Sequence, residues 1–372
     1  MYYQDEYSCT FREEAELHQH LYEIDRRGWW KRMPSSDLEV ISASGHEDMA
    51  SEVDGENREA LLLDTMKHTS LLLKAHGETY LLGATALPTL QRRARISGSA
   101  LSVVGKPELA YILNECLAVA EGKALLRYSE GKIRAVHAGD QKDYSIIEMP
   151  DIFMAASAYI EEGFDRAVFS GGYADHAMTY ATWTVEDKKL LTAYQELLAH
   201  YGRRTPQELS TDIRITTSDV AASGANISYS IKEGGLTIVL GKALKTIHRG
   251  NGGIEMVEAN IRNIFEYYKS TIKGIERLFD IQLRYPENAM AGVMGSVKLG
   301  QKLIAETVEQ FKAQNGYQPC NAYDAYCGIC YALCLARKNG AKERAMLDME
   351  EDIARCITAR WSEYDIPGEI KY

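Results

Sequence analysis

The amphipathic pattern of this chain changes at the glycine-rich segment 250–253, and this change constrains the fold more than any other feature. Before the segment, apolar residues occur in short runs separated by turn residues. After it, Ile254, Val257 and Ile261 begin a series of apolar residues at steps of three and four, which predicts one helix over 254–279. Further helices are expected at about 296–313, 322–338 and 342–361.

The segment before the change contains signals for strands as well as helices. Two β-prone runs flank the loop SEG at 129–131, which predicts a hairpin, and a second hairpin is predicted over 166–185. Helical patterns occupy 107–121, 151–162 and 187–201, and strand patterns follow between 212 and 249. Because strands and helices do not alternate strictly, we expect an α+β fold with a mainly antiparallel sheet and helices on one face. An all-helical C-terminal part follows.

Charge is distributed unevenly along the chain. Of its 372 residues, 53 are acidic and 42 basic, which gives a net charge of −11. We expect three parts: an acidic, irregular N-terminal extension over 1–60, an α+β body over 61–250, and a helical part over 251–372 that packs on the body. No run approaches the roughly 18 apolar residues of a membrane helix, and the N-terminal segment lacks the basic start of a secretion signal. We therefore expect a cytoplasmic protein without a membrane partner.

Seven cysteines are present, and four of them lie close together: Cys320, Cys327, Cys330 and Cys334. Four thiols at this spacing resemble a zinc or iron–sulfur motif. However, the last three recur at helical steps within an Ala- and Tyr-rich segment, which is typical of a buried helix face. We expect a structural role without metal or cofactor, and a redox role stays open.

The sequence contains no strong catalytic signature. It has no G-x-S-x-G motif, no phosphate loop, no dinucleotide fingerprint and no H-E-x-x-H motif. His137 and His176 lie on the two predicted hairpins and would approach a common site if those hairpins paired in one sheet. We therefore predict no catalytic residues, although an enzyme of unknown reaction stays an alternative.

Basic residues form one cluster that lacks local acidic partners. Arg92, Arg93, Arg95 and Lys106 lie within a segment, 88–107, that contains no acidic residue. Basic residues further along the sequence would extend this cluster into a basic strip across one sheet. Tyrosines lie between them, and their rings are able to stack on bases. The alternative is a mixed, solvated face on an acidic protein. The predicted nucleic-acid or anion-binding residues are Arg92, Arg93, Arg95, Lys106, Lys245, His248 and Arg249.

Two stretches carry a resemblance to a known family. They are ITTSDVAASGANI at 215–227 and GLTIVLGKALKTIHRG at 235–250, followed by the helical tail. Together they resemble the phage- and plasmid-encoded family called domain of unknown function nine-thirty-two. Ser218, Asp219 and Val220 match the SDV of its SDVG-like strand, whereas its usual Cys-Asn-Gly is absent here. The resemblance implies a mobile-element origin and an accessory role.

These observations favour a non-catalytic protein of a phage or mobile element that acts by binding. The preferred partner is single-stranded nucleic acid, which the protein would bind or anneal through the basic strip. An inhibitor that binds a host defence protein is the alternative, because an acidic N-terminal region would suit a basic partner. A homo-oligomer is compatible with either hypothesis.

Overall fold

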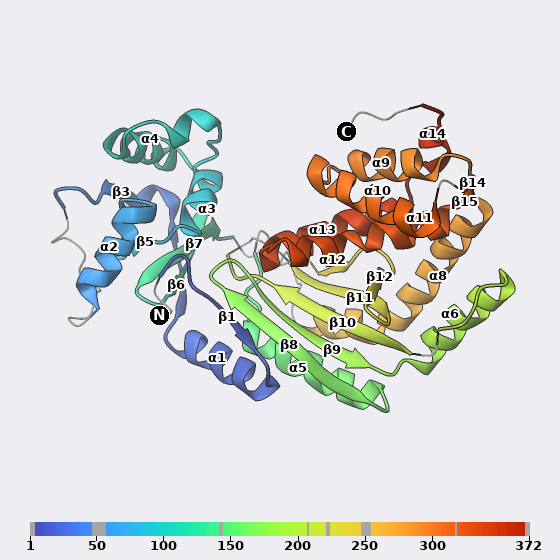
Figure 1. Cartoon of the computed structure of the whole chain (residues 1–372). Coiled ribbons are helices and arrows are strands. Elements are labelled where there is room, and N and C mark those ends of the chain that lie inside the picture. Colours follow the sequence, from blue (N-terminus) through green and yellow to red (C-terminus); the bar gives the residue numbers. More distant parts are fainter. Residues whose placement is uncertain are drawn as a thin grey trace.

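The protein has two lobes, each built around its own β-sheet (Figure 1). The computed structural model describes residues 4–46, 57–140, 144–206, 208–220, 224–246, 254–316 and 318–368. We call residues 28–140 the small lobe and the remaining described residues the large lobe. The two principal hydrophobic cores follow this division, because one contains only small-lobe residues and the other only large-lobe residues.

The large lobe contains a seven-stranded sheet in which all paired strands are antiparallel. Its order is β1-β8-β9-β10-β11-β12, and β13 also pairs with β11. The strands are β1 (Ser8–Phe11), β8 (Ala167–Asp175), β9 (Thr179–Val185), β10 (Leu209–Thr217), β11 (Ala225–Glu233), β12 (Leu236–Val239) and β13 (Leu244–Thr246). Side chains alternate between the two faces of each strand, so Ile213 and Ile215 enter the core while Arg214 and Thr216 face the other side.

Helices cover the apolar face of this sheet. Those that contact its strands there are α1 (Glu14–Arg26), α5 (Met149–Gly163), α6 (Lys188–His200) and α7 (Ile254–Arg262). Helix α8 (Ile264–Asp280) packs on α6. Trp183 of β9 is buried in this core, and its indole N–H donates to Glu14 of α1. The apolar face is therefore closed, which leaves the polar face as the side of the sheet available to a ligand.

The C-terminal part of the large lobe is helical, as expected. It comprises α9 (Pro286–Ser296), α10 (Gln301–Asn315), α11 (Ala322–Cys330), α12 (Ala332–Lys338), α13 (Glu343–Cys356) and α14 (Trp361–Tyr364), with the short strands β14 (Gln282–Leu283) and β15 (Cys320–Asn321). Buried residues of α9 to α13 join the large-lobe core. Helix α13 also lies against the polar face of the sheet, because Glu350 pairs with Arg214 and Glu343 accepts a hydrogen bond from Tyr180.

The small lobe contains a six-stranded sheet of order β2-β6-β7-β5-β4-β3. Its strands are β2 (Trp29–Pro34), β3 (Glu39–Ser42), β4 (Leu71–Ala75), β5 (Glu78–Leu82), β6 (Lys123–Ser129) and β7 (Lys132–Ala138). The pair β5–β7 is parallel and the others are antiparallel. The helices are α2 (Arg58–His68), α3 (Ala86–Arg93) and α4 (Lys106–Ala118), with short 3₁₀ turns at Ser35–Asp37 and Ser99–Ser102.

The predicted hairpin at the loop SEG is present and tighter than expected. Ser129 and Lys132 pair directly, so the loop contains two residues, Glu130 and Gly131. Both have positive φ angles, 53° and 79°. This combination is characteristic of a type I′ turn, whose twist matches that of the flanking strands.

The predicted α+β class is confirmed, with mainly antiparallel strands and a helical C-terminal part. Two local predictions are wrong. Residues 4–46 are not irregular, because they provide β1 to the large sheet and β2 and β3 to the small sheet. The single helix over 254–279 is divided between α7 and α8 at Asn263, whose φ and ψ of −88° and 1° are not those of a regular helix.

The three predicted domain ranges stay a prediction, and the two lobes follow other boundaries. None of the helices in the described ranges has the length and apolar character that crossing a membrane requires.

Candidate functional site

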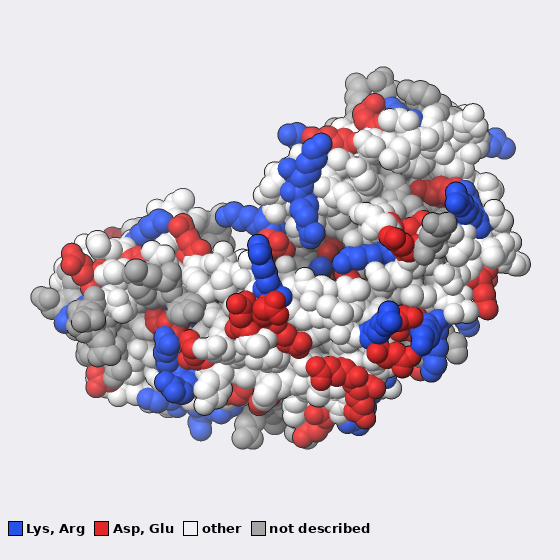
Figure 2. All heavy atoms as spheres, turned by 60° about the horizontal axis from the view of Figure 1, so that its bottom comes forward, with Lys and Arg blue, Asp and Glu red and all other residues white. Residues whose placement is uncertain are grey.

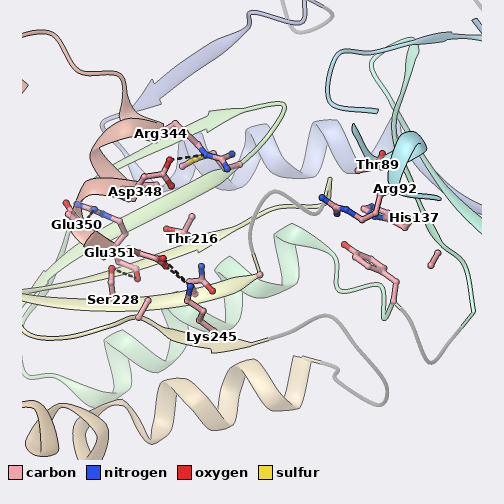
Figure 3. A pocket seen from close by; sticks show the side chains of 18 of the residues that line it. Thr89, Arg92, His137, Thr216, Ser228, Lys245, Arg344, Asp348, Glu350 and Glu351 are labelled. Carbon is pink, nitrogen blue, oxygen red and sulfur yellow. Dashed lines mark hydrogen bonds and ion pairs between the residues drawn. The ribbon is translucent and has the colours of Figure 1, made fainter. Parts of the chain in front are cut away.

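A cavity of about 920 Å³ lies between the two lobes. Its lining comes from the polar face of the large sheet and from α13 on one side, and from α3, β7 and nearby loops of the small lobe on the other (Figure 3). This volume is within the range of roughly 300–1,000 Å³ that is usual for small-ligand sites. On the face shown in Figure 2, basic and acidic side chains both gather around the junction of the lobes.

The sheet wall of the cavity is polar because the strands alternate. The apolar members of β10 and β11 pack against helices, and the intervening residues line the cavity. These residues are Asp212, Arg214, Thr216, Asn226, Ser228 and Ser230. The wall therefore offers hydroxyl and amide groups together with two charged side chains.

The cations of this wall already have carboxylate partners. Arg214 Nη1 lies 2.5 Å from Glu350 of α13, and Lys245 Nζ lies 3.0 Å from Glu351. Burial by itself would lower the pKa of Arg214, but the Glu350 carboxylate, together with Tyr180 and Asp212, outweighs burial and raises the pKa above its ordinary value. On the large-lobe side, positive charge is thus largely neutralised by α13.

Helix α13 presents one face to the cavity. Arg344, Leu347, Asp348 and Glu351 line it at positions i, i+3, i+4 and i+7, which lie on one side of a helix. Met346 and Ile353 are buried in the large-lobe core and hold the helix in place. This face of α13 therefore carries two carboxylates, one guanidinium group and one apolar side chain, which makes it acidic on balance.

The small-lobe wall carries two of the predicted arginines in an accessible form. Arg92, near the end of α3, and Arg95, just after it, line the cavity and are exposed. Within the described ranges, neither guanidinium group makes a hydrogen bond or an ion pair. Figure 3 shows the Arg92 side chain directed toward the gap between the walls. These two guanidinium groups are therefore available to a ligand, as is the ammonium group of Lys123, another exposed lining residue.

Arg93, the third arginine of the predicted cluster, has a different role. Its side chain is 8% exposed, and Nε donates to Ser35 Oγ at 2.6 Å. Nη2 also donates to the carbonyl oxygen of Glu121. Arg93 thus joins α3 to the start of β6 and the turn after β2, although it also lines the cavity.

An aromatic cluster joins the two lobes beside the cavity, with Trp30 and His137 from the small lobe and Tyr144 from the large lobe. The rings of His137 and Tyr144 stack with centroids 4.3 Å apart and planes inclined by 10°, and the Trp30 ring lies 5.9 Å from His137. Burial, followed by the nearby Asp219 carboxylate, raises the pKa of Tyr144 well above its ordinary value, so its hydroxyl stays protonated. His137 Nε2 lies 3.0 Å from the carbonyl oxygen of Asp219.

Asp219, part of the SDV sequence, connects the lobes. Its carboxylate accepts a hydrogen bond of 2.8 Å from Nε of Arg127, a residue of β6 whose side chain is 2% exposed. Trp30 Nε1 donates to Glu148 at 3.3 Å in a second contact between the lobes. Asp219, one of the residues that carried the family resemblance, therefore lies at the junction.

The other predicted residues lie elsewhere. Lys106 begins α4 and is not among the lining residues of the cavity. His248 and Arg249 lie outside the described residues. His176 is partly buried and contacts the carbonyl oxygen of Gln4, so the structure does not bring it to His137. Tyr173 and Tyr180 stack on the large sheet with centroids 5.6 Å apart.

Cysteines of the C-terminal cluster take part in the packing of the large-lobe core and do not surround a common ligand site. Cys330 is fully buried in the core, and burial raises the pKa of its thiol to about 12. Burial likewise raises the pKa of Cys320 to about 12. Thiols with raised pKa values are poor nucleophiles and poor metal ligands at neutral pH. No group of three possible ligands in the described part of the chain includes a cysteine.

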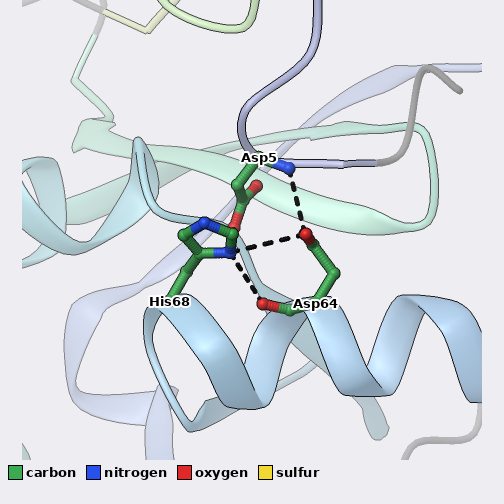
Figure 4. Close-up of side chains that lie close together, drawn as sticks. All are labelled: Asp5, Asp64 and His68. Carbon is green, nitrogen blue, oxygen red and sulfur yellow. Dashed lines mark hydrogen bonds and ion pairs between the residues drawn. The ribbon is translucent and has the colours of Figure 1, made fainter.

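One group of possible metal ligands does occur in the described ranges: Asp5, Asp64 and His68 (Figure 4). Two buried cations already lie against its carboxylates. Lys132 Nζ is 3.3 Å from Asp5 and also bonds Asp64, while Arg134 bonds Asp5. The two positive charges balance the two carboxylates, so the cluster is a buried ion-pair network that fixes the N-terminal segment to the small lobe.

Comparisons with known protein families, curated proteins and solved structures found no match. The resemblance described above therefore stays a prediction, and the cavity has to be interpreted from its own chemistry. The sequence indicated its basic wall through Arg92 and Arg95 but missed its acidic wall. Alternation along 212–216 and 226–230 was the signal from which the sheet wall could have been found.

Proposed function

We propose that the protein binds single-stranded nucleic acid in the cavity between its lobes, with Arg92 and Arg95 as the phosphate contacts. The observation that carries the proposal is the availability of these two guanidinium groups, which are exposed, line the cavity and lack protein partners in the described ranges. Arginine forms paired hydrogen bonds with phosphate oxygens, which suits this position.

The size of the cavity favours a short unpaired segment over a duplex. A volume of about 920 Å³ accommodates a few nucleotides and is walled on two sides by protein. A long duplex would require an extended basic surface, whereas the chain has a net charge of −11 and an acidic helix beside the cavity. Binding would therefore be local and limited to a small number of phosphate contacts.

The chemistry of the remaining lining is compatible with bases and sugars. Ser228 and Thr216 offer hydroxyl groups on the sheet wall, and Tyr144 and His137 are aromatic residues of the lining. Hydroxyl and amide groups bond to base edges and to sugar oxygens, and they carry no charge that would repel a phosphate. No step of covalent chemistry is part of the proposal.

The test is fluorescence anisotropy with a labelled twelve-nucleotide single strand, compared at several salt concentrations from about 50 mM upward. The double variant Arg92→Ala/Arg95→Ala is expected to lose about two units of the slope of log affinity against log salt, and most of its affinity. The matched control is Arg12→Ala/Arg26→Ala, which removes two exposed arginines that do not line the cavity.

Two results would reject the proposal. One is an absence of binding by the unaltered protein at about 50 mM salt, which would favour the alternative of a protein partner. The other is an equal loss of affinity in the control and in the cavity variant, because that would indicate a general effect of net charge.

A further inference from the structure

We infer that the cavity accepts cytosine or adenine, which carry an amino group at C4 or C6, in preference to thymine or uracil. This inference rests on the proposed function and concerns the orientation and identity of the nucleotide. It follows from the difference in charge between the two walls (Figure 3). Arg92 and Arg95 line the small-lobe wall, whereas on α13 the carboxylates of Asp348 and Glu351 outnumber the single guanidinium group of Arg344.

Among the carboxylates of the α13 wall, Asp348 is the one least engaged by the protein. Glu350 lies 2.5 Å from Arg214, and Glu351 lies 3.0 Å from Lys245. Asp348 is 71% exposed at its side chain, and its ion pair within the described residues is to Arg344 at 3.9 Å, longer than a hydrogen bond. Its oxygens are thus able to accept hydrogen bonds from a ligand.

The two walls together impose one orientation on a nucleotide. A phosphate placed against Asp348 would be repelled, whereas a phosphate against Arg92 and Arg95 is attracted. The base is then directed toward α13, where Leu347 lies beside Asp348 and provides an apolar contact for a ring. Both walls are needed to place the phosphate toward the arginines and the base toward α13. The hydroxyl groups of the sheet wall are neutral, so they do not oppose this orientation.

The preference among bases follows from hydrogen-bonding chemistry. An ionised carboxylate is an acceptor only. Cytosine and adenine present an amino group that donates to it, whereas thymine and uracil present a carbonyl oxygen at the corresponding position. Placing that carbonyl oxygen against a carboxylate leaves two acceptors facing each other, which is unfavourable.

The experiment compares labelled oligo(dC) and oligo(dT) of twelve nucleotides at pH 7.5 and about 50 mM salt, because these pyrimidines match in size. The unaltered protein is expected to bind oligo(dC) about five-fold more tightly, an order of magnitude typical of one specific base contact. In Asp348→Asn the ratio is expected to fall to about one, since an amide donates as well as accepts. Asp352→Asn is the matched control on the same helix, outside the cavity lining, and should keep the ratio.

The outcomes separate this inference from the proposed function. Equal binding of the two oligomers by the unaltered protein overturns the inference alone, as does an unchanged ratio in Asp348→Asn. An absence of binding to both oligomers instead rejects the proposed function. Arg92→Ala/Arg95→Ala should lower the affinity for both oligomers by the same factor, because contacts to phosphate groups do not distinguish one base from another.

Discussion

The Glu351 carboxylate lies 3.0 Å from the Lys245 ammonium group, and both residues line the cavity between the lobes. Lys245 was predicted as an anion-binding residue, yet a helix more than 90 residues further along the chain supplies its counter-ion. Both side chains of the pair are about half exposed, so the ion pair contributes little to the stability of the fold. It nevertheless removes one cation from the binding surface.

Removing this counter-ion should increase binding. In Glu351→Gln, Lys245 becomes available to a phosphate, and we expect the salt slope to rise by about one with a higher affinity at low salt. Fluorescence anisotropy measures both quantities. Glu363→Gln, which changes an exposed acid of α14 outside the cavity lining, serves as the control. A gain of the same size in the control would assign the effect to net charge.

The adjacent arginines should separate into a binding and a structural residue. Arg93→Ala leaves Ser35 Oγ and the Glu121 carbonyl without their buried donor, so we expect a loss of about 2–3 kcal/mol in the free energy of unfolding. Arg92→Ala removes an exposed side chain and should change stability by less than about 0.5 kcal/mol. Urea unfolding measures both, and similar losses in the two variants would contradict the assignment.

The buried cysteine Cys330 is expected to be structural. Cys330→Ser places a hydroxyl group in an apolar core and should lower stability by about 1–3 kcal/mol. Because burial raises its pKa to about 12, the native thiol should react with a disulfide reagent at pH 7.5 only after unfolding. Elemental analysis is the accompanying check, and about one zinc or several irons per chain would contradict the structural role.

Glu148 should make stability depend on pH. Burial, and then the nearby Asp25, raises its pKa to about 7 from an ordinary value of 4.5. Between these values the folded protein binds more protons than the unfolded chain, so the free energy of unfolding falls as pH rises from about 4.5 to 7. Solvent access to this group reduces the effect to roughly 1 kcal/mol.

The measurement for Glu148 is a series of urea unfolding curves between pH 4.5 and 8. In Glu148→Gln the decline across this window should become smaller, because the titrating group is gone. The amide keeps an oxygen that accepts the hydrogen bond from Trp30 Nε1. A decline of unchanged size in the variant would show that another group titrates.

The class of fold was predictable because periodicity is local. The turn at Glu130 and Gly131 and the alternation along β10 are properties of a few consecutive residues. The division into two sheets was not predictable, since it depends on which distant strands pair. Ser8 pairs with Asp175, and Trp29 pairs with Tyr128, and no local pattern around these residues indicates either partner.

The candidate site was half predictable for the same reason. The absence of acids around Arg92 and Arg95 is a local property, and it indicated two cations that the fold leaves available. Arg93 could not be distinguished from them, because its partners come from the turn after β2 and from the loop that precedes β6. The acidic face of α13 was overlooked because an amphipathic helix with charged outer positions is ordinary.

The position of β1 has a consequence for the order of folding. Asp5 bonds Arg134 of the small lobe, while Ser8 to Phe11 pair with β8 of the large lobe. During synthesis, β1 leaves the ribosome long before β8, so it has no strand to pair with until much of the remaining chain has emerged. Pairing over such sequence separations is slow. The small lobe can complete its own sheet meanwhile, which makes docking of β1 a late step and leaves the edge of β8 exposed until that step occurs.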